Sequence, residues 1–326
     1  MTFFGPSADR APGPGSNTSA SVSPGLLIGA GFLVLLVLVF GVEWAAAGTG
    51  ERRVPGAAFT AVLRTVVFAA LSVHLGELMA SKLVAAVPGR PGAAATSWAV
   101  GASLLGTAAA AGQVFPLAAA MRLGITESLA TREGALLLAV AGGLLLAAFC
   151  AACRRPHLAL LPIAVAIGAE ALRAHPEPYS PMIGAALTVV HLTAASLWAG
   201  SLLYVLRTMW LWRRTPHAAR SLLMRYARVA IWLYAALVGT GTVSTLRRLP
   251  FDVVLTSAYG RILLVKLGLM ALVSALALLA RWRMLRAPDP LLAHRLARRE
   301  QVVLVLVLAV SALLTVAPDP HWVSTS

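Results

Sequence analysis

The chain has 326 residues, of which 59% are hydrophobic and only 12% are charged, and this composition excludes an ordinary soluble globular protein. Its formal net charge of +15 would suggest a nucleic-acid partner in a soluble protein. Here the arginines cluster between apolar runs, where basic residues fix membrane orientation, so nucleic acid is discounted as a partner. Two cysteines, Cys150 and Cys153, are too few for a disulfide framework.

Apolar runs of about 20 residues recur along the whole chain, and each is long enough to cross a bilayer as a helix. Residues 1–25, rich in Pro, Gly and Ser, are expected to be a disordered tail. Nine spans are predicted, near residues 26–46, 58–80, 96–118, 134–153, 157–173, 182–206, 228–246, 261–281 and 301–317. The first is interpreted as an uncleaved anchor. The predicted fold class is all-α, a polytopic transmembrane helical bundle.

Lysine and arginine residues are distributed unevenly between the two sides of these spans. With Lys266 left out as intramembrane, the side that holds the N-terminus carries 17 of them and the other side carries nine. By the positive-inside rule, the N-terminus is expected in the cytoplasm and the C-terminus on the external side.

This orientation sorts the side chains that can bind a metal by their depth in the membrane. His175, Met182 and His321 are predicted at or near the external side, and Cys150 and Cys153 at the cytoplasmic edge. His74 and His191 are predicted near mid-membrane, with Glu77 one turn after His74 on the same helix face. Thioether, imidazole and thiolate donors at three depths are what a soft ion such as Cu(I) needs to move by ligand exchange. A polar side chain inside the membrane also predicts a function by default.

Each of these residues also has a purely structural interpretation. Methionine and cysteine are common fillers in helix packing. The two histidines can simply form hydrogen bonds between helices, and Glu77 can pair with Arg64, Lys82 or Lys266. No catalytic constellation is recognised, so no enzymatic activity is expected.

Four stretches in the second half of the chain form an ordered set of motifs. They are VHLTAASLWAG at 190–200, ARVAIWLYAALVGTGTVSTL at 227–246, SAYGRILLVKLGLMALVSALALLARWR at 257–283 and REQVVLVLVLAVSALLTVAPDP at 299–320. This set resembles the copper resistance D (CopD) family over roughly residues 182–320. The resemblance divides the membrane part into an N-terminal bundle of about five spans, 26–174, and a CopD-like domain of four spans, 182–320.

The resemblance implies an inner-membrane protein that moves copper ions from the external side towards the cytoplasm. A separate extracytoplasmic copper chaperone of the CopC type is the partner expected from it. The family's motif residues correspond to His191, Trp198, Gly200, Tyr259, Gly260, Arg261, Lys266 and Glu300. Ser201 stands where the family often has a second glycine. Arg261 and Lys266 are expected to set helix position at the external interface by snorkelling rather than to bind a cation.

Two alternatives stay open at this point. In the first, the protein is a membrane cytochrome, and His74 and His191 on facing helices are the axial ligands of one haem b. In the second, it is an assembly factor that delivers copper to a respiratory oxidase. A shared ion or haem requires the two histidines to approach one another, and one bridging ion at about 2 Å from each nitrogen requires their Cβ atoms to lie within about 10 Å.

Overall fold

The computed structural model describes residues 24–51, 56–173, 180–248, 253–286 and 290–317. These residues contain α-helices and one 3-10 turn but no strand. The elements are α1 (Pro24–Ala46), α2 (Ala57–Ala85), α3 (Ala99–Gly112), α4 (Val114–Met121), α5 (Ile125–Ala130), α6 (Arg132–Ala152), η1 (Pro156–Ala159), α7 (Leu160–Arg173), α8 (Pro181–Leu211), α9 (Pro216–Arg248), α10 (Ala258–Arg286) and α11 (Pro290–Leu314). The predicted tail, 1–25, lies almost wholly outside the described residues.

Each of the nine predicted spans falls on a helix, or on two consecutive helical segments, of this bundle. Among the described residues, seven helical segments are both long and apolar enough to cross a membrane. The remaining two runs, on α1 and α11, form shorter apolar segments, Gly31–Ala46 and Gln301–Leu314. The all-α polytopic fold is therefore confirmed, with seven of the nine predicted spans meeting both criteria.

Prolines define several of the helix boundaries. Helices α8, α9 and α11 begin at Pro181, Pro216 and Pro290, where the missing N–H costs nothing because the first turn has no partner for it. The predicted third span is interrupted after Gly112, and α4 starts two residues later with Pro116 in its first turn. A proline there removes a helical hydrogen bond and clashes with the carbonyl one turn earlier, which explains the break.

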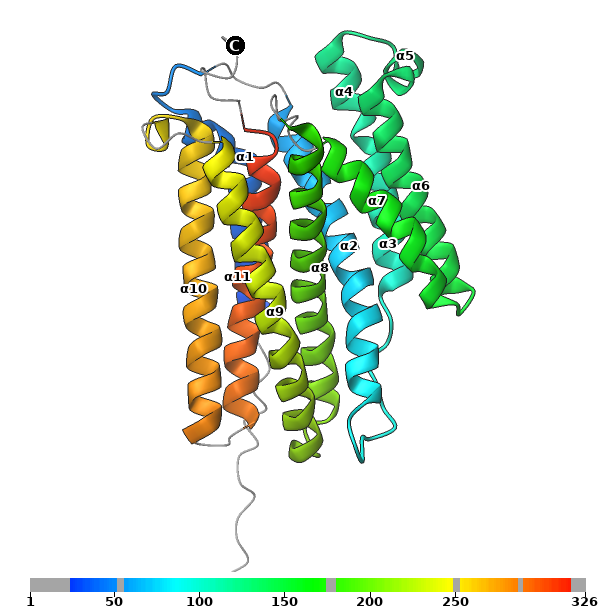
Figure 1. The fold of residues 1–326 in the computed structure, drawn as a ribbon, viewed down its shortest axis with the longest axis vertical. Helices are drawn as coiled ribbons and strands as arrows, with labels where there is room; N and C mark the ends of the chain where they lie inside the picture. The colour runs from blue at the N-terminus through cyan, green and yellow to red at the C-terminus, as the bar shows by residue number, and fades with distance from the viewer. Residues whose placement is uncertain (1–23, 52–55, 174–179, 249–252, 287–289, 318–326) are drawn as a thin grey trace, which may run out of the picture.

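Figure 1 shows a long bundle made of α1, α2, α8, α9, α10 and α11, with α3 to α7 grouped to one side of α2 and α8. Helix α2 packs most extensively against α8, and α10 packs mainly against α11. Three buried apolar clusters hold the bundle together: one between α2, α8, α9 and α11, one between α2 and the α3 to α7 group, and one around α1, α10 and α11. Helix α2 contributes to all three clusters and is the central element of the fold.

Helices α2 and α8 meet at a pair of glycines. A Cβ atom on Gly200 would lie far inside van der Waals contact of the Ser72 carbonyl oxygen, and one on Gly76 would overlap the backbone of Gly200. Small residues let two helix backbones approach closely, which is the main source of helix association in lipid. The hydroxyl of Ser201 donates to the Gly76 carbonyl oxygen at 3.4 Å across the same contact. This contact also fixes the axial register of the two helices.

The bundle is longer than the membrane is thick. Helix α8 has 31 residues and α9 has 33, which correspond to roughly 46 and 50 Å, against a hydrocarbon thickness of about 30 Å. One end, which we call the arginine end, carries Arg207, Arg213, Arg214 and Arg220 where α8 is followed by α9. The other, the Thr315 end, is where α2, α8 and α10 begin and α11 finishes.

Candidate metal site

His191 lies on α8, ten residues from its start at the Thr315 end, and is half-buried against α9. Its Nδ1 atom is 2.9 Å from the hydroxyl oxygen of Thr240 on α9. That hydroxyl donates its own proton to the Ala236 carbonyl oxygen at 2.6 Å, so it accepts the hydrogen bond from the imidazole Nδ1–H. The other ring nitrogen, Nε2, is therefore left with its lone pair, which is the form of histidine that binds a metal.

The surroundings of this imidazole are cationic and lack carboxylates. Lys266 on α10 is close enough to His191 for its charge to act on the ring. Among the described residues there is no group of three or more His, Cys, Asp or Glu side chains that could hold a metal ion. His191 thus offers one nitrogen ligand, and any metal there needs further ligands from elsewhere.

His74 lies on α2 and is completely buried. Its Nδ1 atom forms a 2.7 Å hydrogen bond with the hydroxyl of Ser103 on α3, and its Nε2 atom has no hydrogen-bond partner among the described residues. The ring is therefore held in the α2 and α3 interface, in the group of helices to the side of α2.

The structure does not bring His74 and His191 together. Gly76 touches Gly200, so His74, two residues before Gly76, lies level with the region of Trp198 on α8. His191 is nine residues before Gly200, which places the two histidines roughly 10 Å apart along the bundle axis. They also form hydrogen bonds with different helices, α3 and α9. The shared ion and the shared haem both lose their geometric basis, and the interhelical hydrogen bonds considered from the sequence are what is observed.

Glu77 is buried and has three partners. Its carboxylate accepts from the Ser97 hydroxyl at 2.6 Å, from the Trp98 backbone N–H at 2.8 Å and from Arg207 at 3.2 Å. The Arg207 guanidinium also lies 3.4 Å above the Trp98 ring and donates to the Thr96 carbonyl oxygen. Glu77 is twenty residues into α2, about 30 Å from its start and level with Arg207 of α8. Its ion-pair partner is Arg207, not Arg64, Lys82 or Lys266, and its charge is fully compensated.

The remaining predicted ligands are scattered. Met182 is 75% exposed at the start of α8, on the same helix as His191. Cys150 and Cys153 are free thiols at the end of α6, which packs against α3 and α7 rather than against α9 or α10. His175 and His321 lie outside the described residues. No chain of ligands from one membrane face to the other is formed by the described donors.

The family motif residues in the described regions have clear structural roles. Trp198 is buried with its ring edge against Tyr234, at 5.7 Å between centroids, and Gly200 forms the contact with α2. A side chain on Gly260 would overlap the Val254 carbonyl, so only glycine fits there. Arg261 donates to the carbonyl oxygens of Ala45 and Ala47 at 3.1 and 2.8 Å, which fastens α10 to the end of α1 as a positioning role predicts. The Glu300 side chain is not among the side chains that the structure describes.

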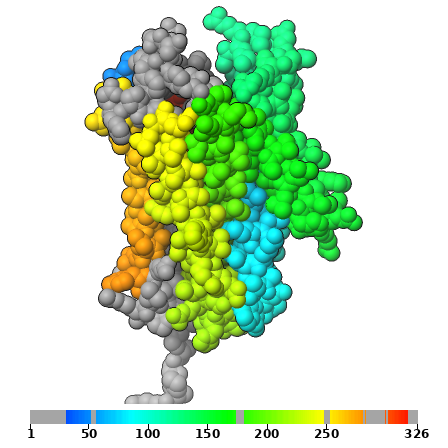
Figure 2. All heavy atoms as spheres, in the orientation of Figure 1, coloured from blue at the N-terminus to red at the C-terminus, as the bar shows by residue number. Residues whose placement is uncertain are grey.

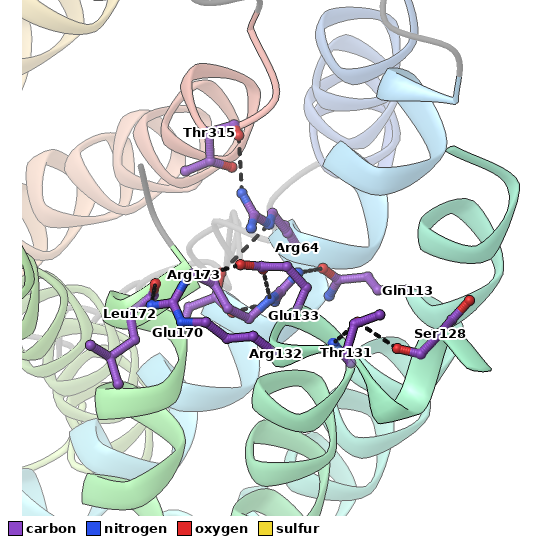
Figure 3. A network of polar contacts seen from close by, with 11 residues as sticks. Arg64, Gln113, Ser128, Thr131, Arg132, Glu133, Glu170, Leu172, Arg173 and Thr315 are labelled. Atoms are coloured by element: carbon purple, nitrogen blue, oxygen red, sulfur yellow. Dashed lines mark hydrogen bonds and ion pairs between the residues drawn. The ribbon is translucent and has the colours of Figure 1, made fainter. Parts of the chain in front are cut away.

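Sequence reasoning missed a network of charged residues at the Thr315 end (Figure 3). Glu170 on α7 is 2% exposed and pairs with Arg173 at 2.7 Å and with Arg64 on α2 at 3.5 Å. Arg64 also donates to the Thr315 carbonyl oxygen at 3.1 Å, and Arg173 donates to Gln113 at 3.1 Å. Glu133 on α6 lies 3.8 Å from Arg173. The network thus ties α2, α3, α6 and α7 to the end of α11.

This network corrects the count of basic residues used for the orientation. Arg64 and Arg173 were both counted among the nine on the external side, yet both side chains are buried and paired inside the bundle. Leaving them out makes the excess of basic residues on the arginine end larger. The arrangement could have been suspected from Glu170 alone, because a carboxylate in an apolar run requires a cationic partner.

We expect Glu170→Gln to destabilise the protein by about 3 kcal/mol, because it leaves two buried guanidinium groups without their shared carboxylate. The thermal midpoint of the purified protein in detergent, followed by tryptophan fluorescence, measures the effect. Glu43→Gln, at an exposed site on α1, is the control and should leave the midpoint unchanged. Equal midpoints for both variants would show that the network contributes nothing to stability.

No curated protein matches this chain, and no solved structure matches it. A family model described as copper resistance protein D (CopD) matches residues 220–317, which cover most of α9 and all of α10 and α11. Three of the four motifs recognised in the sequence overlap this region, while the motif that holds His191 precedes it. The match is consistent with a CopD family protein, a membrane protein related to copper resistance.

Proposed function

We propose that this protein moves copper ions across the cell membrane, from the external side towards the cytoplasm, and that His191 binds the ion on its way. The observation that carries the proposal is the hydrogen bond from His191 to Thr240, which leaves Nε2 as a free nitrogen ligand inside an apolar helix. Thr240 belongs to the region that matches the CopD family, so the partner of His191 is supplied by that region. The match to the CopD family model supports copper as the metal.

Cu(I) suits this site better than a divalent ion. A neutral imidazole takes a monovalent soft ion without gathering several negative charges in the membrane, and the described residues offer no carboxylate cluster for a harder ion. Met182, exposed near the start of α8, provides a thioether at the Thr315 end, nine residues before His191. His175 and His321, near the same end in the sequence-based topology, belong to the same proposed entry. Cys150 and Cys153 would serve a copper ion only after it has left the His191 helix.

The proposed orientation places the arginine end in the cytoplasm and the Thr315 end outside. Copper would then reach the Thr315 end from a separate chaperone of the CopC type. Delivery of copper to a respiratory oxidase would use the same ligands as copper import. The two functions differ in the partner protein and not in the metal site. A b-type cytochrome is less well supported, because His74 and His191 form hydrogen bonds with different helices.

An optical spectrum and metal analysis of the purified protein test this choice directly. We expect one copper-binding site that is lost in His191→Ala, and no Soret band. A Soret band that disappears in His191→Ala would replace the copper proposal by the cytochrome.

Thr240→Val should weaken Cu(I) binding roughly 10-fold to 100-fold, the usual cost of removing the partner that orients a ligating histidine. Thr240→Ser keeps the hydroxyl and should bind as the wild type does. Competition with a coloured Cu(I) chelator gives the affinities, and ¹⁵N NMR of the histidine ring reports whether Nδ1 still carries the proton. Thr65→Val, which removes a similar hydroxyl bonded to its own helix on α2, is the matched control. Unchanged affinity in Thr240→Val would remove Thr240 from the site.

A further inference from the structure

Lys266 is an unpaired cation inside the membrane part of α10. It lies eight residues from the start of the helix, about 12 Å along its axis, and is half-buried. It forms no hydrogen bond or ion pair with any described residue, unlike Arg64, Arg173, Arg207 and Arg261. The chain contains one other lysine, Lys82, which is exposed near the end of α2.

The register of the helices places this ammonium at the depth of His191. The Tyr234 hydroxyl on α9 donates to the Ser274 hydroxyl on α10 at 2.8 Å, since Ser274 gives its own proton to the Met270 carbonyl, and the two helices run in opposite directions. Counting six residues along each helix from that contact brings Thr240 opposite residue 268. Lys266 is thus within about 3 Å of the height of Thr240, which holds His191. The charge of Lys266 also acts on the His191 ring.

Helices α9 and α10, which carry Thr240 and Lys266, are not closely packed against one another. Helix α9 packs mainly against α8, and α10 packs mainly against α11 and α1, while α9 and α10 share hardly any backbone contact. Their surfaces lie side by side in Figure 2. The long Tyr234 side chain bridges them one and a half turns or more from Thr240. The His191 ring lies against α9, beside Thr240 and Gly241, and Lys266 lies at about the same height on α10.

Among the described residues, no carboxylate forms an ion pair with this lysine. Helices α8, α9 and α10 contain no Asp or Glu anywhere along their length. An unpaired charge is costly in the membrane, and ionisable residues there pair with an opposite charge or line a wet passage. A second cation, the copper ion on His191, would add repulsion to this cost. One mobile anion eases both problems, because it balances the lysine while copper is absent and reduces the repulsion between the two cations while copper is bound.

We propose that Lys266 holds a small monovalent anion, chloride under cellular conditions, beside His191, and that this anion is the second ligand of the copper ion. The inference rests on the proposed role of His191 in copper binding. Cu(I) accepts two ligands, and here these would be the His191 Nε2 atom and a chloride ion. The unit formed by the neutral imidazole, Cu(I) and chloride has no net charge. The ammonium balances the anion before copper arrives and after it leaves. Copper is then carried through this part of the bundle together with an anion, not as a bare cation.

The first test measures the anion without copper. In chelator-treated, copper-free protein, the ³⁵Cl NMR linewidth should broaden with wild type and return to the buffer value when excess bromide competes. Lys266→Gln should lose the broadening, and Lys266→Arg should keep it because the charge is retained. Lys82→Gln is the matched control and should behave as the wild type. Equal broadening in the wild type and Lys266→Gln, or none in either, overturns the anion site.

The second test joins the anion to copper and needs no variant for its main result. We expect Cu(I) affinity of the wild type, corrected for copper and chloride association in solution, to rise roughly tenfold or more when gluconate is replaced by chloride. Lys266→Gln should lose this dependence. His191→Ala should lose copper binding and keep the ³⁵Cl signal, which separates the two sites. If Cu(I) binds through His191 with the same affinity in gluconate and in chloride, this inference is overturned and the proposed function stands. If His191→Ala keeps both Cu(I) binding and the ³⁵Cl broadening, the proposed function is overturned.

Discussion

Replacing Gly200 with alanine should abolish recovery of folded protein. A single methyl group there would overlap the Ser72 carbonyl oxygen, which belongs to the backbone of α2 and cannot move without separating the two helices. The α2 and α8 interface is the most extensive in the bundle, and it includes the buried side chains of both neighbouring apolar clusters. Opening it exposes close-packed surfaces to lipid, and we expect a loss of more than about 4 kcal/mol, beyond what an ordinary substitution costs.

Size-exclusion chromatography in detergent and a thermal melt by tryptophan fluorescence measure this effect. Gly142→Ala on α6 is the matched control, since a Cβ atom there meets nothing within 4 Å. Alanine is the better helix former, so that variant should be as stable as the wild type or slightly more stable. A monodisperse Gly200→Ala protein with the wild-type melting temperature would mean that α2 and α8 are farther apart than the structure places them.

The positions of the helices follow from the sequence because hydrophobic length and proline placement are local properties. All nine apolar runs fall on helices, and the starts of α8, α9 and α11 coincide with Pro181, Pro216 and Pro290. Helices α9 and α11 begin twelve and eleven residues before their predicted spans, because their first parts are helical although they carry several arginines. Helix formation there needs no apolar run.

The contacts between helices were harder to predict, because depth along a span gives no information on which way a side chain faces. His74 and Ser72 are two residues apart on α2, yet the backbone carbonyl of Ser72 lies against α8 while the His74 side chain bonds to α3. Glu77 was predicted to need a partner, but its partner, Arg207, is 130 residues away and was assigned to a loop. Thr240, which fixes the His191 ring, gave no signal because a single threonine in an apolar helix is unremarkable in composition.

His191→Ala should abolish copper-dependent accumulation in cells that carry the protein. The substitution removes the one nitrogen ligand that the structure leaves free between α8, α9 and α10, and it leaves the buried Gly76 and Gly200 contact untouched. His191→Met should retain part of the activity, because a thioether is still a soft ligand for Cu(I). Haem ligation or proton transfer would tolerate methionine less well.

Cellular copper measured in strains with equal amounts of each variant distinguishes these cases. His217→Ala, exposed at the arginine end of α9, is the control and should accumulate copper as the wild type does. Equal accumulation by the wild type and His191→Ala would mean that this histidine only joins α8 to α9, and copper would then need another route. Partial activity in His191→Met together with none in His191→Ala is the pattern that a ligand, rather than a packing residue, produces. Methionine also fills much of the volume of the half-buried ring, so it could restore activity through packing alone. The melting temperature of His191→Ala separates the two explanations: an inactive variant with an unchanged melting temperature has lost a ligand, not packing.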